Sequence, residues 1–142
     1  MKRTAFTLME LMVVVIIIGI MAGYALPQYQ RAVRKAHERD AIVQLTAIQA
    51  ANIMYYAKNG AYLPVAATLT AINTGLNINI IPNDMTYAYT RTSTSAFTAS
   101  ATWDEAGTTN DFMLIINQAA AGAGNPCCST TTPSQCPTRA SC

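Results

Sequence analysis

The stretch FTLMELMVVVIIIGIMAGYAL, Phe6 to Leu26, decides the architecture of this chain. It is 21 residues long and carries one charge, Glu10. As a helix with a rise of 1.5 Å per residue it would be ~31 Å long, about the thickness of a bilayer's hydrocarbon core. The five residues before it, MKRTA, include Lys2 and Arg3. The stretch therefore predicts a membrane-spanning helix with one carboxylate near its start.

The helical pattern continues past this stretch. Residues 28–40, QYQRAVRKAHERD, are polar, and an amphipathic face follows at spacings of three and four. That face comprises Ala41, Leu45, Ile48, Asn52 and Tyr55, with Ile42 and Tyr56 at its edges. Asn59-Gly60 is a stop signal, because glycine adopts the left-handed conformation at low cost. We expect one long helix from Phe6 to about Lys58.

Gly19, Gly23 and Pro27 interrupt the apolar half of this helix. Proline removes a backbone donor and clashes with the preceding turn. A kink or local opening is therefore expected between Gly19 and Pro27.

The remainder predicts an irregular connection followed by a small sheet. Residues 59–84 contain a possible short helix, Val65–Ile72, and an extended piece, Leu76–Ile81. Three strands are predicted after them: Met85–Thr92, Ala96–Trp103 and Phe112–Asn117. The short spacings favour an antiparallel meander. The fold class is α+β, one long helix packed against this sheet (residues 85–117).

Period-two alternation assigns faces to the first two strands. Tyr87, Tyr89 and Arg91 share one face. Phe97, Ala99, Ala101 and Trp103 are assigned to another.

Four cysteines lie close together in residues 118–142, hereafter the tail: Cys127, Cys128, Cys136 and Cys142. An even number in a Thr/Ser/Pro-rich segment indicates disulfides and an oxidising compartment. Four cysteines allow three connectivities, and adjacent cysteines rarely bond each other, so Cys127 and Cys128 should each pair with Cys136 or Cys142. Zinc is the weaker alternative, since C-x-x-C and a nearby histidine are both missing. The tail is otherwise predicted to be a loop.

Two common interpretations of the N-terminus conflict with Glu10. A secretory signal peptide would be cut near Gly23-Tyr24-Ala25, leaving Leu26 first, but its apolar region disfavours a carboxylate. A plain membrane anchor would bear a cost of ~2.5–3.5 kcal/mol for such a charge. Glu10 is better explained if it has a partner.

Ala5-Phe6-Thr7-Leu8-Met9-Glu10-Leu11, after a basic leader and before an apolar run, resembles the type IV prepilin processing motif. The resemblance continues through Gly19, Pro27 and Tyr29 and ends with YYAKNGAYLP at Tyr55–Pro64. It covers roughly the first 64 residues and does not extend to the sheet or the tail in detail.

The resemblance implies processing and assembly. A prepilin peptidase would cut between Ala5 and Phe6 and methylate the new amine of Phe6. Glu10 would pair with the N-terminal ammonium of a neighbouring subunit, which makes a buried carboxylate tolerable and fixes the axial position. Gly19 to Pro27 resembles the stretch that loosens during assembly. Ala5 departs from the family, which usually has glycine before the cut.

The resemblance also implies an organisation: leader 1–5, spanning and assembly segment 6–27, and pilin body 28–142 with its amphipathic helix at 28–58. The chain would be held in the inner membrane with its C-terminus outside, and an assembly platform would polymerise it into an extracellular pilus. Such filaments serve adhesion, twitching motility or DNA uptake. The alternatives are a type II secretion pseudopilin and, from another class, a secreted or anchored globular binding domain.

The charges on either side of the span do not decide its orientation. Lys2 and Arg3 precede it, while a basic cluster follows: Arg31, Arg34, Lys35 and Arg39. The oxidised cysteines and the processing motif place the C-terminal side outside. Glu38 and Asp40 lie within the cluster, so it is partly self-paired along the helix. The cluster is interpreted as a solvated or subunit-packing face, with DNA or lipid contact as the minority alternative.

Other features indicate little chemistry. The chain has 9 Lys and Arg against 7 Asp and Glu, which does not predict a strongly basic nucleic-acid binder. His37 is expected on the helix surface. Asp104, Glu105 and Asp111 could bind calcium but are more simply solvated. The Ser/Thr runs at 92–95 and 129–132 are candidates for O-linked sugars. No catalytic motif is found, so neither an enzyme nor a cofactor is expected.

Overall fold

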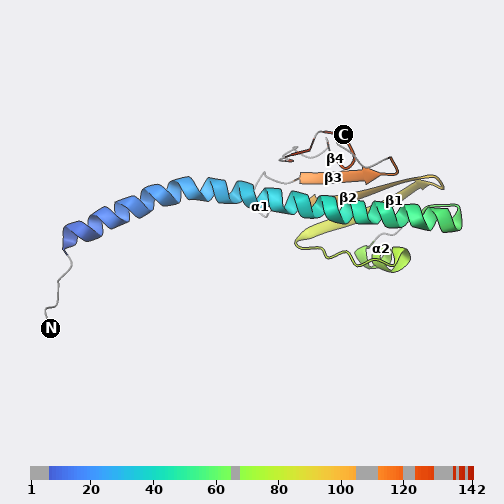
Figure 1. Ribbon diagram of the computed structural model, residues 1–142, viewed down its shortest axis with the longest axis horizontal. Helices are drawn as coiled ribbons and strands as arrows, with labels where there is room; N and C mark the ends of the chain where they lie inside the picture. The colour runs from blue at the N-terminus through green and yellow to red at the C-terminus, as the bar shows by residue number, and fades with distance from the viewer. Residues whose placement is uncertain are drawn as a thin grey trace. The chain divides into compact units, whose positions relative to one another are not determined.

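The computed structural model of the chain describes residues 7–64, 68–104, 112–119, 124–129, 136, 138–139 and 141–142. Along the chain the elements are α1 (Leu8–Asn59), α2 (Leu69–Leu76), β1 (Met85–Ser93), β2 (Ala96–Trp103), β3 (Phe112–Asn117) and β4 (Cys127–Cys128) (Figure 1). The chain divides into two compact units, residues 1–34 and 35–142, which we describe separately. The predicted α+β fold is confirmed.

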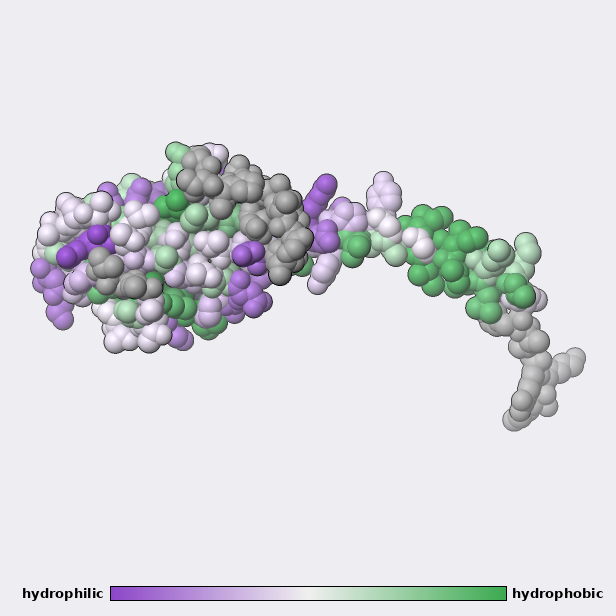
Figure 2. Space-filling view, turned by 180° about the vertical axis from the view of Figure 1, so that it is seen from behind, coloured by the Kyte–Doolittle hydropathy of each residue, from purple (hydrophilic) through white to green (hydrophobic). Residues whose placement is uncertain are grey.

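The first unit contains the apolar half of α1. The helix is unbroken through Gly19 and Pro27, so the expected local opening is not observed. Pro27 removes one backbone donor, and the hydrogen bonds on either side of it keep the helix intact. Apolar side chains surround this half and remain exposed, for example Val15 at 65% and Ile18 at 60% (Figure 2). The described residues of this unit do not bury this apolar surface.

In the second unit the remainder of α1 runs along the sheet (Figure 1). The predicted face is confirmed: Ala41, Leu45, Ile48 and Asn52 are buried, and Tyr55 packs against the core. Two polar residues of α1 are buried as well, Glu38 and Gln49. The core also includes the inward side chains of the sheet: Met85, Tyr87, Tyr89, Phe97, Ala99, Ala101, Trp103, Phe112, Leu114 and Ile116.

The four strands form one antiparallel sheet in the order β1-β2-β3-β4. Tyr87 lies opposite Ala101, and Tyr89 opposite Ala99. Residues directly opposite each other share a face of the sheet. The assignment of the two sets of alternating residues to different faces is therefore wrong, since both line the core side.

Helix α2 lies later in the chain than the predicted Val65–Ile72, of which residues 65–67 are outside the described residues. It begins after Thr68, whose hydroxyl accepts a hydrogen bond from Ala71 N at 3.2 Å. It ends at Asn77, which adopts the left-handed conformation. The expected extended piece at 76–81 forms no strand in the sheet.

The two edges of the sheet differ. At one edge, β4 forms within the predicted loop of the tail and pairs with Leu114 and Ile115 of β3. At the other, no strand among the described residues pairs with the outer side of β1, and the pairing of β1 with β2 shifts register between Arg91 and Ser93. Tyr62 N donates to Thr94 O at the adjoining turn, 3.0 Å away.

Candidate functional site

The carboxylate of Glu10 is part of a capping box at the start of α1. Thr7 N and Thr7 Oγ1 donate to Glu10 Oε2 at 3.1 and 2.9 Å. Glu10 N donates in return to Thr7 Oγ1 at 3.3 Å. This reciprocal arrangement satisfies backbone donors that have no partner inside the helix. The Thr-x-x-Glu spacing of this cap is visible in the sequence as Thr7 and Glu10.

The bonds from Thr7 use one oxygen of this carboxylate. Both end on Oε2, and none of the hydrogen bonds between described residues uses Oε1. Ala5 and Phe6, the predicted cleavage residues, lie outside the described residues, so the cut and the methylation stay predictions.

The helix that carries Glu10 meets the requirements of a membrane span. In the part of the chain that the structure describes, α1 is the one helix long and apolar enough to cross a membrane. Its most apolar window is not buried by the described residues of its own unit. A helix that is apolar on every side is normally covered by lipid or by other helices.

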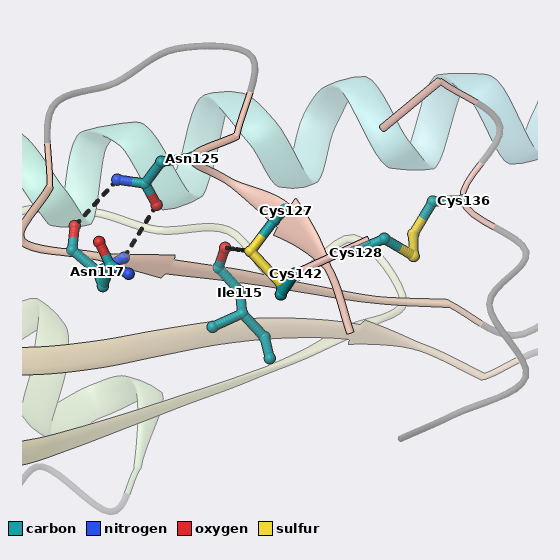
Figure 3. The surroundings of a disulfide bond; sticks show 7 residues. All are labelled: Ile115, Asn117, Asn125, Cys127, Cys128, Cys136 and Cys142. Carbon is teal, nitrogen blue, oxygen red and sulfur yellow. Dashed lines mark hydrogen bonds between the residues drawn. A yellow bond between two sulfur atoms is a disulfide. The ribbon is translucent and has the colours of Figure 1, made fainter. Parts of the chain in front are cut away.

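Two disulfides fasten the tail. Cys127 bonds Cys142, and Cys128 bonds Cys136, with Cα–Cα distances of 5.1 and 6.1 Å (Figure 3). Each of the adjacent cysteines thus pairs with Cys136 or Cys142, as predicted. The zinc alternative is wrong, because these disulfides use all four sulfur atoms.

Asparagine side chains close the loop that leads into β4. Asn117 N donates to Asn125 Oδ1 at 3.1 Å, and Asn125 Nδ2 donates to Asn117 O at 3.3 Å (Figure 3). From α1, Gln49 Nε2 donates to Asn117 O and Ala119 O, both at 2.6 Å. The two bonds from Gln49 join positions 68 and 70 residues apart in sequence, so residue spacing could not predict them.

Glu38 is fully buried and holds a second point of the tail. Its carboxylate accepts hydrogen bonds from Thr138 N at 3.1 Å and Thr138 Oγ1 at 2.9 Å. The sequence predicts Glu38 only as a member of a partly self-paired charge cluster on the helix. Its side chain enters the body instead of remaining on the helix surface.

His37 is half-buried on the helix surface. Its ring stacks on Trp103, with centroids 4.9 Å apart and planes inclined by 20°. Asp40, another member of the predicted cluster, accepts a hydrogen bond from Asn83 Nδ2 at 3.2 Å.

Two tyrosines of β1 have shifted ionisation. Burial raises the pKa of Tyr87 to about 12, and the nearby Asp40 carboxylate adds to the effect. Burial also raises the pKa of Tyr89, against a smaller lowering by its hydrogen bond from Asn52. Asn52 Nδ2 donates to Tyr89 Oη at 2.7 Å, and Asn52 Oδ1 accepts from Leu63 N at 3.0 Å. These contacts are structural and form no reactive group.

The other candidates from the sequence are the acidic residues considered for calcium and the Ser/Thr runs considered for O-linked sugars. Among the described residues, no three His, Cys, Asp or Glu side chains are grouped to hold a metal ion. Asp104 is exposed, while Glu105 and Asp111 lie outside the described residues. Ser129 is buried, which argues against a sugar there. The other hydroxyl run, residues 92–95, is exposed at the β1–β2 turn.

Comparisons with known proteins cover both units. The family model described as "Type IV minor pilin ComP, DNA uptake sequence receptor" matches residues 27–132. The model described as "Prokaryotic N-terminal methylation motif" matches residues 1–26.

Individual relatives match shorter stretches. "Type II secretion system core protein G" of Vibrio cholerae is 37% identical over 73 residues, 51% of this chain and 50% of that protein. "Type IV major pilin protein PilE1" of Neisseria gonorrhoeae is 40% identical over 58 residues, 41% of this chain and 35% of that protein. The matches thus span about half or less of these relatives' length. By the match over residues 27–132, the chain belongs to the type IV minor pilin family, whose members are structural subunits.

Proposed function

We propose that this chain is a minor subunit of a type IV pilus and that it serves in DNA uptake. The observation that carries the proposal is the family match over residues 27–132, together with the methylation motif over residues 1–26. A uniformly apolar, exposed half-helix joined to a well-packed body also suits a subunit that is stored in a membrane and then buried in a filament.

The proposed maturation begins with cleavage between Ala5 and Phe6 and methylation of the Phe6 amine. The new ammonium then approaches the Glu10 carboxylate of a neighbouring subunit. Oε1 receives it while Oε2 remains engaged by Thr7. The pairing neutralises a carboxylate that would be costly in an apolar filament core. Gly19 and Pro27 stay in the proposed assembly segment.

DNA contact is supported by the family description and by the placement of basic residues. Lys35 and Arg39 are exposed on α1, on either side of the segment that carries Glu38. Glu38 binds Thr138, the residue before Arg139 in the sequence. Contacts from lysine and arginine side chains to DNA phosphates do not depend on base sequence, so such contacts from this group would supply affinity.

Mass spectrometry of the N-terminus of the mature protein tests the pilin assignment. We expect methylated Phe6 as the first residue. The matched variant Ala5→Gly restores the residue usual in the family and should be processed at least as completely. A mature chain that begins at Leu26 would establish signal-peptide cleavage and remove the assignment.

Gel-shift titration of the full chain in detergent with duplex DNA tests the DNA role. The variant Lys35→Gln/Arg39→Gln should bind more weakly and should lose less affinity as salt is raised. Lys58→Gln changes a basic residue at the other end of the same helix and is the matched control. If the wild-type chain binds no DNA, the uptake role is removed and the pilin assignment is untouched.

The similarity to core protein G makes a secretion pseudopilin the second candidate. Deletion of the chain's gene separates the two roles. A loss of transformation with normal protein secretion favours the pilus, and the reverse favours the secretion system.

A further inference from the structure

Loop closure does not explain which cysteines pair in the tail. The observed disulfides close separations of 15 and 8 residues. Exchanging partners, to Cys128–Cys142 and Cys127–Cys136, would close loops of nearly the same lengths. Because closure probability falls with about the 3/2 power of loop length, the two arrangements differ by only about 1.1-fold. Contacts outside the tail must therefore select the partners.

The two disulfides lie on opposite faces of the sheet. Successive residues of a strand point to opposite sides, so Cys127 and Cys128 diverge. Cys128 lies opposite Leu114, which belongs to the core on the α1 side. Cys127 lies opposite Ile115, with its Sγ 3.7 Å from Ile115 O (Figure 3). The partner of Cys128 must therefore arrive on the α1 side.

Cys136 is on that side, because it packs against the core cluster that includes α1. Two residues later, Thr138 is held by both carboxylate oxygens of Glu38. The tail then leaves this position, and Cys142 N donates to Cys128 O at 2.7 Å. Glu38 thus fixes the tail at Thr138, between Cys136 and Cys142.

We propose that Glu38 is a positioning residue for disulfide pairing: it binds Thr138 and directs Cys136 to Cys128. A buried carboxylate in a helix face of alanine and leucine is costly unless it is hydrogen-bonded. An apolar residue would fill the same space without that cost. The carboxylate supplies what an apolar residue cannot, two directional acceptors, one for the backbone N–H and one for the hydroxyl of Thr138 in the tail.

A competition experiment isolates this choice. The full chain carrying Cys142→Ser leaves Cys127 and Cys128 to compete for Cys136. The reduced protein is oxidised with glutathione disulfide, which accepts the two electrons and leaves as two thiols when one protein disulfide forms. The remaining thiol is alkylated, and fragmentation between the two adjacent cysteines shows which of them carries the label.

With Glu38 present, we expect label on Cys127 to exceed label on Cys128 by at least tenfold. Glu38→Ala should bring the ratio close to one. Glu38→Gln retains an acceptor oxygen and should give an intermediate ratio. Thr138→Val removes only the hydroxyl bond, leaves the carboxylate in place, and should shift the ratio less than Glu38→Ala.

Gln49→Ala provides the matched control, because Gln49 is another buried polar residue of α1 that contacts the chain at residues 117–119. It should lower the melting temperature without changing the ratio. An unchanged ratio in Glu38→Ala would overturn the proposal and leave Glu38 a purely stabilising role. If that variant does not fold, an unchanged ratio in both Glu38→Gln and Thr138→Val has the same meaning.

Discussion

Similar apolar side chains are exposed in the first half of α1 and buried in the second half. Val15 and Ile18 in the first half are exposed at 65% and 60%, whereas Leu45 and Ile48 in the second half are fully buried. The first half is apolar on all sides, and the second confines its apolar residues to one stripe. The second half is therefore covered by its own chain, whereas an apolar surface like that of the first half is normally covered by lipid or by other helices.

Removing Glu10, the single charge between Phe6 and Leu26, should have the largest effect. Glu10→Ala leaves the incoming ammonium of a neighbour without its partner, and stranding one member of a buried ion pair costs ~3–5 kcal/mol. We expect roughly a hundredfold less of this chain in an immunoblot of sheared pili, with normal processing. Thr7→Ala, which breaks the capping box and keeps the carboxylate, should reduce this incorporation far less. Wild-type incorporation of Glu10→Ala would contradict the pairing.

Truncating one apolar side chain in each half tests the comparison directly. Leu45→Ala should lower the free energy of unfolding of the body by about 2–5 kcal/mol, because it leaves a cavity in the core. Val15→Ala should change it by less than about 0.5 kcal/mol, since Val15 has no core to lose. Urea unfolding in detergent, followed by Trp103 fluorescence, measures both. Equal losses would show that the first half also supports the body.

A smaller, pH-dependent effect on the free energy of unfolding should come from Tyr87 in β1. The pKa of Tyr87 is about 12 in the folded chain, above its unfolded value near 10. Its contribution to stability is therefore complete below pH 10 and is lost as the pH rises from about 10 through about 12. Tyr87→Phe should flatten the fall in unfolding free energy over that interval. If unfolding free energy falls equally with pH in the wild type and in Tyr87→Phe, the pKa of Tyr87 is the same in the folded and unfolded chains, which would contradict the prediction.

Periodicity predicted most of the fold. The long helix, its buried face and three strands follow from spacings of three and four or of two. The boundaries of β2 and β3 agree with those predicted, and β1 is one residue longer. The Thr68 cap moves α2 along the chain, because a single side-chain acceptor fixes where a short helix begins.

Long-range contacts were not predictable in the same way. A two-residue strand such as β4 has no period to detect. The bond between Glu38 and Thr138 joins positions 100 residues apart, and the stacking of His37 on Trp103 depends on the sheet lying against α1. For the candidate site, the motif predicted Glu10, while its bond to Thr7 required only the local Thr-x-x-Glu spacing.

The open edge of β1 has a consequence for a chain whose relatives polymerise. Crowding many copies together exposes each unpaired strand edge to its neighbours, and long flat edges invite misaligned aggregation. The register shift between Arg91 and Ser93 makes this edge irregular near the turn, and the Tyr62 contact to Thr94 ties down the turn itself. An irregular edge beside a fixed turn is a poorer template for strand pairing between copies than a long flat edge would be.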